Sequence, residues 1–338
     1  AAMVDALPYL ANYPHRCTEQ TLNRFVPTVI THKIIKEMGV DLEQVRRKRV
    51  NLNAQEIGDD RERAGQWQRW EANPVFDPAK VKEMTQAGLE RLAAMQCSDG
   101  GWGWFSGWGE RSWPHTTAVV VHGLQLARES GVAVVPGMLA RGVAWLERHQ
   151  AGELQELENG RKEPKVKPWK AHPSNLDAYV YLVLVKEGRD NREMLSFLYE
   201  DRNHLSVYGK AMLGLACHAN GAKAKRDMLL RNIEQYLRQD EENRTAWLDL
   251  PNSGYWWYWY GSEYEAHAAY LKLLAAVKPK AEVASRLVKY LLNNRKHATY
   301  WKSTRDTAWC LEAFAAYLQA TGEHRPEMTV QVLVDGKQ

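Results

Sequence analysis

The sequence lacks any long apolar run, any disulfide framework and any paired spacing of metal ligands. No uninterrupted apolar stretch approaches the roughly 20 residues that a membrane-spanning helix needs. Four cysteines in 338 residues are too few for a disulfide framework. Neither the cysteines nor the histidines follow the spacing of a structural zinc site. These absences argue against a membrane span, a disulfide-stapled scaffold and a zinc module, and we expect no metal and no cofactor.

The chain also carries little net charge. Its formal charge is +4, and its 45% hydrophobic and 25% charged residues are ordinary for a globular protein. The basic residues are scattered except for a run at 46–49. Such a short run is more typical of a solvated helix face than of a phosphate-binding surface. We therefore expect no nucleic-acid partner.

Apolar residues recur at helical spacing through most of the chain. The pattern predicts helices at about 18–38, 41–57, 78–95, 115–130, 137–150, 174–187, 190–200, 204–219, 223–239, 263–277, 280–294 and 303–320. The glycines predicted to end helices are Gly131, Gly188, Gly221 and Gly322. Pro27 is expected to interrupt the first helix, and the charged interval 152–173 is predicted to be a long exposed loop.

About twelve helices at roughly 50 residues per pair indicate a repeat architecture. The segments 115–130 and 303–320 are apolar around much of their circumference, whereas 41–57 and 223–239 carry many charges. Because a helix that is apolar all round must be buried, the alternation favours an inner and an outer ring. We predict an all-α fold, an (α/α)6 toroid, over residues 1–325. Residues 326–338 read as a strand and turn, so we expect them to begin a following β-domain and the chain to be an excised domain.

Cys17 and Gln20 carry the chemistry that the sequence suggests. Three residues apart, they can face each other across one helical turn. Attack of the thiolate on the carboxamide, with loss of ammonia, would give a cyclic internal thioester, a stored acyl donor. We expect the N-terminus of the following helix to lower the pKa of Cys17. We also expect the unpaired N–H groups of that helix to stabilise the oxyanion that develops as the Gln20 carboxamide is attacked. Glu19 is expected to support the turn by polar contacts, and Tyr13 to help shield the bond.

The other three cysteines have no such context. Cys217 and Cys310 lie within apolar helical patterns, where a free cysteine behaves as a small buried hydrophobe. Cys97 precedes a glycine-rich turn and has no spaced partner. We therefore assign chemistry to Cys17 alone.

The motif also carries a family resemblance. The quartet Cys17–Gln20, followed by Pro27–Ile30, resembles the thioester region of the alpha-2-macroglobulin and complement thioester proteins, and its flanks look most like the bacterial members. The segments Gly100–Phe105, Gly261–Glu265 and Ser303–Ala308 are similar, in order, to parts of the same domain. The resemblance thus covers most of the chain.

What the resemblance implies is a covalent protease trap rather than an enzyme. In such proteins a protease cuts a bait segment, the thioester is exposed, and a lysine amine of the protease is acylated. The implied partners are target proteases and neighbouring β-domains, and the implied location is the periplasm or cell surface. The motif departs from the vertebrate pattern, because Arg16 and Thr18 flank the cysteine where glycines are typical. Some complement-type members use a downstream histidine, but neither His149 nor His172 matches a motif, so we assign neither.

The abundant aromatic residues leave an alternative open. Seven of the 14 tryptophans are concentrated in the loop 98–113 and in the run 255–260. Packing at the mouth of the toroid and against neighbouring domains is the simpler reading. The alternative is an (α/α)6 carbohydrate-active enzyme, for which Glu263, Glu265 and Asp306 would be the candidate carboxylates. The sequence shows neither the aspartate cluster typical of terpene cyclases nor the Asp, Cys and His zinc ligands of protein prenyltransferases.

Overall fold

A computed structural model of the chain describes residues 2–15, 17–39, 41–42, 73–251, 261–297 and 299–323. In this part of the chain there are twelve α-helices, two 3₁₀ turns and one β-hairpin. The helices are α1 (Ala2–Ala11), α2 (Thr18–Glu37), α5 (Pro78–Ala94), α6 (Pro114–Glu129), α7 (Pro136–Arg161), α8 (Asn175–Lys186), α9 (Arg192–Glu200), α10 (Val207–Ala219), α11 (Lys223–Glu234), α12 (Glu263–Val277), α13 (Glu282–Asn293) and α14 (Thr304–Thr321). The 3₁₀ turns are η1 (Pro74–Phe76) and η2 (Arg202–His204), and the hairpin pairs β1 (Leu237–Asp240) with β2 (Thr245–Leu248).

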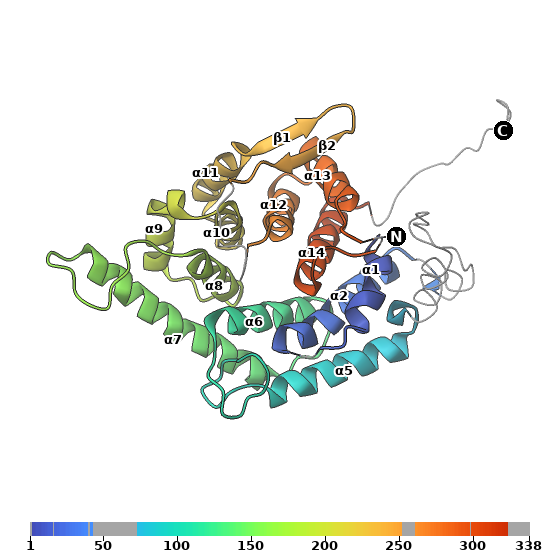
Figure 1. Cartoon of the computed structure of the whole chain (residues 1–338), viewed down its shortest axis with the longest axis horizontal. Helices are drawn as coiled ribbons and strands as arrows, with labels where there is room; N and C mark the ends of the chain where they lie inside the picture. The colour runs from blue at the N-terminus through green and yellow to red at the C-terminus, as the bar shows by residue number, and fades with distance from the viewer. Residues whose placement is uncertain are drawn as a thin grey trace.

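The helices form two concentric rings (Figure 1). The inner ring is α2, α6, α8, α10, α12 and α14; each contacts the next, and α14 closes the ring on α2. The helices α1, α5, α7, α9, α11 and α13 lie outside them. This arrangement confirms the predicted all-α, (α/α)6 toroid. The apolar segments now seen as α6 and α14 are inner helices, and the charged α11 is an outer one, as their composition predicted.

All inner helices start at the same end of the toroid. Contacts join first turns to first turns, as where Ser262 of the α12 N-cap donates to Asp306 of α14. Other contacts join last turns, as where Lys33 of α2 donates to the carbonyl oxygen of Glu129 in α6 at 2.9 Å. The toroid therefore has one face of helix N-termini and one face of C-termini. Residue 17 lies on the N-terminal face, as the N-cap of α2.

Two buried tryptophans close equivalent turns between an outer and an inner helix. The indole of Trp102 donates to the carbonyl of Leu92 in α5 at 2.8 Å, and that of Trp301 donates to Leu291 in α13 at 2.9 Å. The backbone N–H of each donates to a threonine hydroxyl, Thr117 of α6 at 2.9 Å or Thr307 of α14 at 3.2 Å. Both rings are completely buried. The recurrence is direct evidence of the repeat.

Glycines allow α5 and α6 to pack closely on α2. A Cβ at Gly88 of α5 would lie 2.4 Å from the ring of Phe25, and one at Gly123 of α6 would lie 2.3 Å from Leu22. Both distances are below any normal contact, so α2 is held between two helices that only glycine lets approach.

Several predicted boundaries were wrong. Pro27 lies inside a continuous α2, because packing against α1, α5, α6 and α14 outweighs its lost hydrogen bond. The predicted loop 152–173 is helical to Arg161, where Leu154 and Leu157 continue the buried stripe of α7. The predicted helix 223–239 ends at Glu234 and leads into the β-hairpin, and α1 was not predicted.

The glycine stops were predicted correctly. All four have positive φ, between 73° at Gly188 and 87° at Gly131. The predicted helix 41–57 (all but its first two residues), the aromatic run 255–260 and the strand in 326–338 lie outside the described residues, so the domain boundary stays a prediction. No helix in the described part of the chain combines the length and the apolarity that crossing a membrane requires.

Candidate functional site

Cys17 and Gln20 face each other across the first turn of α2. Cys17 is the N-cap, with an extended backbone at φ −65° and ψ 171°. Its backbone N–H donates to Gln20 Oε1 at 3.3 Å, and the Gln20 backbone N–H points back at the Cys17 side chain. This is a capping box in which a thiol replaces the usual hydroxyl. It brings the sulfur and the carboxamide of the predicted pair to the same turn.

The pair opens onto a surface pocket of about 490 Å³. Besides Cys17 and Gln20, the pocket is lined by Arg91 of α5, by Trp104 and Phe105 of the loop 98–113, and by His15. The sequence pattern predicted no role for His15 or Arg91. The position of His15, two residues before Cys17, could have indicated that it lies near the site, whereas no feature of the sequence indicated Arg91.

Thr18 fastens the loop 98–113 to the start of α2. Its hydroxyl donates to the carbonyl oxygens of Gly103 at 2.7 Å and Trp104 at 3.0 Å, and its backbone N–H donates to Trp104 at 2.9 Å. Thr18 is completely buried. A glycine here would keep only the backbone bond, so the departure from the vertebrate motif has a structural use in this chain. Arg16, the other departure, lies outside the described residues.

Glu110 stiffens the same loop from within. Its carboxylate accepts the backbone N–H groups of Trp104 at 2.7 Å, Phe105 at 3.1 Å and Ser106 at 2.8 Å. Burial is the largest single influence and raises the pKa of Glu110, but the three donors together outweigh it and hold this pKa below its usual value. A carboxylate that accepts several N–H groups is strongly stabilised as the anion. The loop therefore presents Trp104 and Phe105 to the pocket on a fixed backbone, with Phe105 69% exposed and Trp108 92% exposed.

The pKa of Cys17 moves in the opposite direction to our expectation. Burial raises it, and the nearby charge of Glu19 raises it further. The backbone N–H groups of Gln20 and Glu19 lower it, as a helix N-terminus should, but they do not outweigh burial. The expectation of a lowered pKa was therefore wrong. A smaller fraction of this thiol is therefore ionised at neutral pH than in a solvent-exposed cysteine.

Glu19 points away from the pocket and into the axis of the toroid. It lines a small axial cavity of about 40 Å³, together with Arg305 of α14. Burial raises the pKa of Glu19 to about 7; Arg305 opposes the rise, and Glu265 and Asp306 add to it. The Arg305 guanidinium is thus the positive charge that Glu19, Glu265 and Asp306 share at this end of the axis. Glu19 acts on the turn through its charge, while direct support of the turn by its polar contacts stays a prediction.

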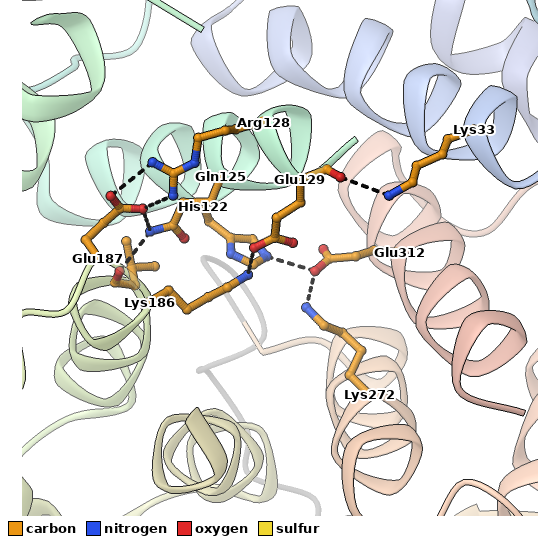
Figure 2. Close-up of polar contacts among 10 residues, drawn as sticks. Lys33, His122, Gln125, Arg128, Glu129, Lys186, Glu187, Lys272 and Glu312 are labelled. Atoms are coloured by element: carbon orange, nitrogen blue, oxygen red, sulfur yellow. Dashed lines mark hydrogen bonds and ion pairs between the residues drawn. The ribbon is translucent and has the colours of Figure 1, made fainter. Parts of the chain in front are cut away.

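At the opposite end of the same cavity the charges are reversed. Glu312 of α14 accepts from Lys272 of α12 and lies 2.9 Å from His122 Nε2 of α6 (Figure 2). Burial alone would raise the pKa of Glu312, but Lys272 and His122 hold it well below its usual range. Burial lowers the pKa of both partners, which favours a neutral imidazole at His122. This end is a buried ionic network that ties three inner helices together.

The carboxylates considered for a glycosidase either take part in helix caps or join neighbouring helices. Glu265 is 1% exposed; it accepts the N–H groups of Gly261 at 2.7 Å and Ser262 at 2.8 Å and pairs with Arg305 at 3.1 Å. Asp306 accepts from Ser262 and Ser303, and Glu263 accepts from the Tyr290 hydroxyl at 2.8 Å. These positions match the simpler reading, in which each acid caps a helix or joins helices.

The remaining candidates lie away from the pocket. His149 of α7 stacks on Trp145, and His172 stacks on His204. Cys97, Cys217 and Cys310 are buried free thiols. Among the described residues no group of three or more His, Cys, Asp or Glu side chains is placed to hold a metal ion.

Comparison with known proteins places this geometry in context. Residues 1–317 match the family model described as the A-macroglobulin TED domain. The chain is 25% identical over 321 residues to an alpha-2-macroglobulin of Thermotoga maritima, covering 94% of this chain and 15% of that protein. It is 28% identical over 251 residues to an alpha-2-macroglobulin homolog of Nostoc, covering 72% of this chain and 12% of that protein. The chain thus spans about one-seventh of the length of these relatives.

Solved structures share the fold. The chain superposes with a TM-score of 0.61 and 21% identity on Salmonella alpha-2-macroglobulin reacted with methylamine, covering 93% of this chain and 17% of that one. For native Escherichia coli alpha-2-macroglobulin from domain MG7 to the C-terminus, the TM-score is 0.56 at 21% identity, covering 94% of this chain and 42% of that one. For trypsin-activated Escherichia coli alpha-2-macroglobulin it is 0.53 at 20% identity, covering 91% and 17%.

Proposed function

The chain belongs to the A-macroglobulin TED family, and from this premise we propose that Cys17 and Gln20 form an internal thioester that acylates amines of an attacking protease. The observation that carries the proposal is the reciprocal contact across the first turn of α2. It holds the nucleophile and the acyl group together, so that the reaction needs no encounter. The Gln20 Oε1 atom, on which the oxyanion would develop, already accepts the backbone N–H of Cys17 at 3.3 Å, which supports this proposal.

The chemistry has two steps. In the first, the Cys17 sulfur bonds to the side-chain carbonyl carbon of Gln20, the carbon–nitrogen bond breaks, and ammonia leaves. In the second, an amine attacks the same carbon, an amide forms, and Cys17 leaves as a thiolate that regains a proton. The carboxamide is consumed, so each molecule reacts once. This is a covalent trap rather than a catalyst with turnover.

The biological setting follows from the family. Relatives in this family are multidomain proteins, and one of them reacts with methylamine while another is activated by trypsin. We place this chain in a protein of the same kind, in which cleavage of a bait exposes the thioester to lysine amines of the protease. Such a trap meets foreign proteases in the periplasm or at the cell surface. Neighbouring β-domains are its partners in the resting state.

Intact mass spectrometry tests the proposal. The protein should weigh one ammonia less than its sequence, and methylamine should add one equivalent while releasing one thiol at residue 17. Cys17→Ala should abolish both changes, whereas Cys217→Ala, which removes a buried thiol on α10, should leave them intact. If the bond has already hydrolysed, peptide mapping will find a carboxylate at position 20. An unchanged carboxamide there, together with no methylamine incorporation, contradicts the proposal.

A further inference from the structure

His15 lies in the pocket onto which Cys17 and Gln20 open. Its side chain is exposed, and no other imidazole lines that pocket among the described residues. Trp104 and Phe105 of the loop 98–113 and Arg91 of α5 line the same pocket. An amine that enters the pocket to reach Gln20 therefore enters a space that an imidazole also lines.

A ladder of aromatic rings holds the segment that carries His15. Tyr300, in the turn before α14, stacks on Tyr9 of α1 with centroids 3.6 Å apart and planes 5° apart. Tyr9 meets Tyr13 edge to face at 5.6 Å, and Tyr13 meets His15 in the same way at 5.7 Å. Edge-to-face contacts of this kind each add about 0.5–1.5 kcal/mol beyond the area they bury. The imidazole is thus positioned by the scaffold although its face is open to solvent.

Among the described residues, few charged or titratable groups lie around His15. Cys17 faces it from the start of α2, Arg91 from α5 and Tyr13 from its own segment. The loop wall of Trp104 and Phe105 brings no titratable group. Histidine in general changes its charge between pH 5 and 8, so it is the side chain best suited to exchange a proton here at neutral pH.

We propose that His15 is the general base of this site, its imidazole taking the proton of the attacking amine as the amine nitrogen bonds to the Gln20 carbonyl carbon. The proposal rests on the thioester function given above. As the carbon–sulfur bond breaks, Cys17 leaves as a thiolate, and the imidazolium returns the proton to it. The ring ends neutral, the sulfur ends as a thiol, and no other reactant is needed.

The same residue serves the formation of the bond. The Cys17 thiol must lose its proton to attack, and the departing nitrogen must gain one to leave as ammonia. An imidazole in the pocket carries the proton from one to the other. General bases that are positioned in this way contribute about 10²–10⁴-fold when water is a poor substitute. In this open pocket water competes, so we expect about a tenfold effect.

The test compares wild type with His15→Asn in their reaction with methylamine. The second-order rate constant is followed by mass increase and by thiol release between pH 5 and pH 8. The ratio of the two rate constants cancels the titration of methylamine itself. It should be about ten at pH 8. The matched control is His218→Asn, which changes an exposed histidine in the last turn of α10. This variant should keep the wild-type rate.

Chemical rescue separates a proton acceptor from a structural side chain. Added imidazole should accelerate His15→Ala in proportion to its concentration and wild type far less. If His15→Ala fails to lose ammonia, imidazole should restore that loss. A ratio of one at all pH values, or a slow variant that imidazole does not rescue, overturns the role of His15 while the thioester stands. Failure of wild type to lose ammonia or to take up methylamine, with an unchanged carboxamide at position 20, removes the proposed function and this inference together.

Discussion

Two glutamates line one small cavity on the axis of the toroid, and their pKa values move in opposite directions. Glu19, below the candidate thioester, has its pKa raised to about 7. Glu312, toward the C-terminal face, has its pKa held well below the usual range. Burial raises both, so burial is not what separates them. The difference lies in the partners that each end of the axis supplies.

Around Glu19 the carboxylates outnumber the cations, because Arg305 is shared with Glu265 and Asp306. Around Glu312 the ammonium of Lys272 makes direct contact and His122 adds a second hydrogen bond. The C-terminal half of the axis is therefore held by a buried ion pair. The half below the candidate thioester holds the Glu19 carboxyl, whose pKa of about 7 allows it to exchange a proton at neutral pH.

Removing Lys272 should give the largest effect. Lys272→Met keeps the stem but leaves Glu312 buried with His122 alone, and breaking a buried pair in this way costs about 3–5 kcal/mol. The free energy of unfolding, measured by urea titration, should fall by that amount. Lys278→Met at the end of the same helix removes an exposed pair with Glu234 at 3.4 Å and should change stability by less than about 0.5 kcal/mol. Equal effects of the two substitutions would refute the contrast.

Glu19→Gln should stabilise the protein, with a gain that grows from about pH 4.5 and is complete above about pH 7. The folded chain keeps the Glu19 proton up to about pH 7, whereas the unfolded chain loses it near the ordinary value of 4.5. The wild-type stability therefore falls as the pH rises through this window, and the loss is complete above pH 7. Allowing for the partial exposure of Glu19, the gain at pH 8 should be about 1–2 kcal/mol. Thermal unfolding at pH 8 and at pH 4.5 checks this, and a gain of equal size at both values would contradict it.

Ser262→Ala should weaken the N-terminal face of the toroid. The hydroxyl caps α12 by accepting the Glu265 N–H at 3.1 Å, and it donates to Asp306 of α14. Losing a cap costs about 1 kcal/mol. Ser206→Ala, which removes the cap of α10 at 3.2 Å without such a bridge to α14, is the matched control. Chemical denaturation should show the larger loss for Ser262→Ala, and the reverse order would contradict the bridging role.

The smallest effect should be on Cys17 itself. Glu19 raises the pKa of the thiol, so Glu19→Gln should lower it and speed alkylation by iodoacetamide about twofold to fivefold at pH 8. The free thiol is generated by methylamine, or by hydrolysis, before the assay. At pH 6, where Glu19 is already protonated, the two proteins should react alike. A rate difference that persists at pH 6 would show that the charge is not the cause.

Much of this molecule was predictable from local sequence. The ring assignment followed from α6 and α14, which are apolar on nearly every side and so had to be enclosed. The site followed from the three-residue spacing of Cys17 and Gln20, since spacing within one turn is fixed by the helix itself. Their thioester remains a prediction.

Features that depend on distant segments were not predictable. Thr18 meets Gly103 across 85 residues of sequence, and no local pattern encodes that contact. The direction of the Cys17 pKa was wrong because burial, which the sequence does not show, outweighs the helix terminus. Pro27 reads as a helix breaker in isolation, and only its neighbours across the inner ring keep α2 continuous.

The paired tryptophan turns bear on how such a molecule is assembled. Fifteen residues separate Trp102 from its threonine partner Thr117, and six separate Trp301 from Thr307. The extra length is the stretch that supplies Trp104 and Phe105 to the pocket at Cys17. The turn at Trp102 thus contains an inserted segment that lines the pocket, whereas the equivalent turn at Trp301 is short. A loop inserted after Trp301 should be tolerated, because the hydrogen bonds of Trp301 to Leu291 and Thr307 anchor this turn as those of Trp102 anchor the other.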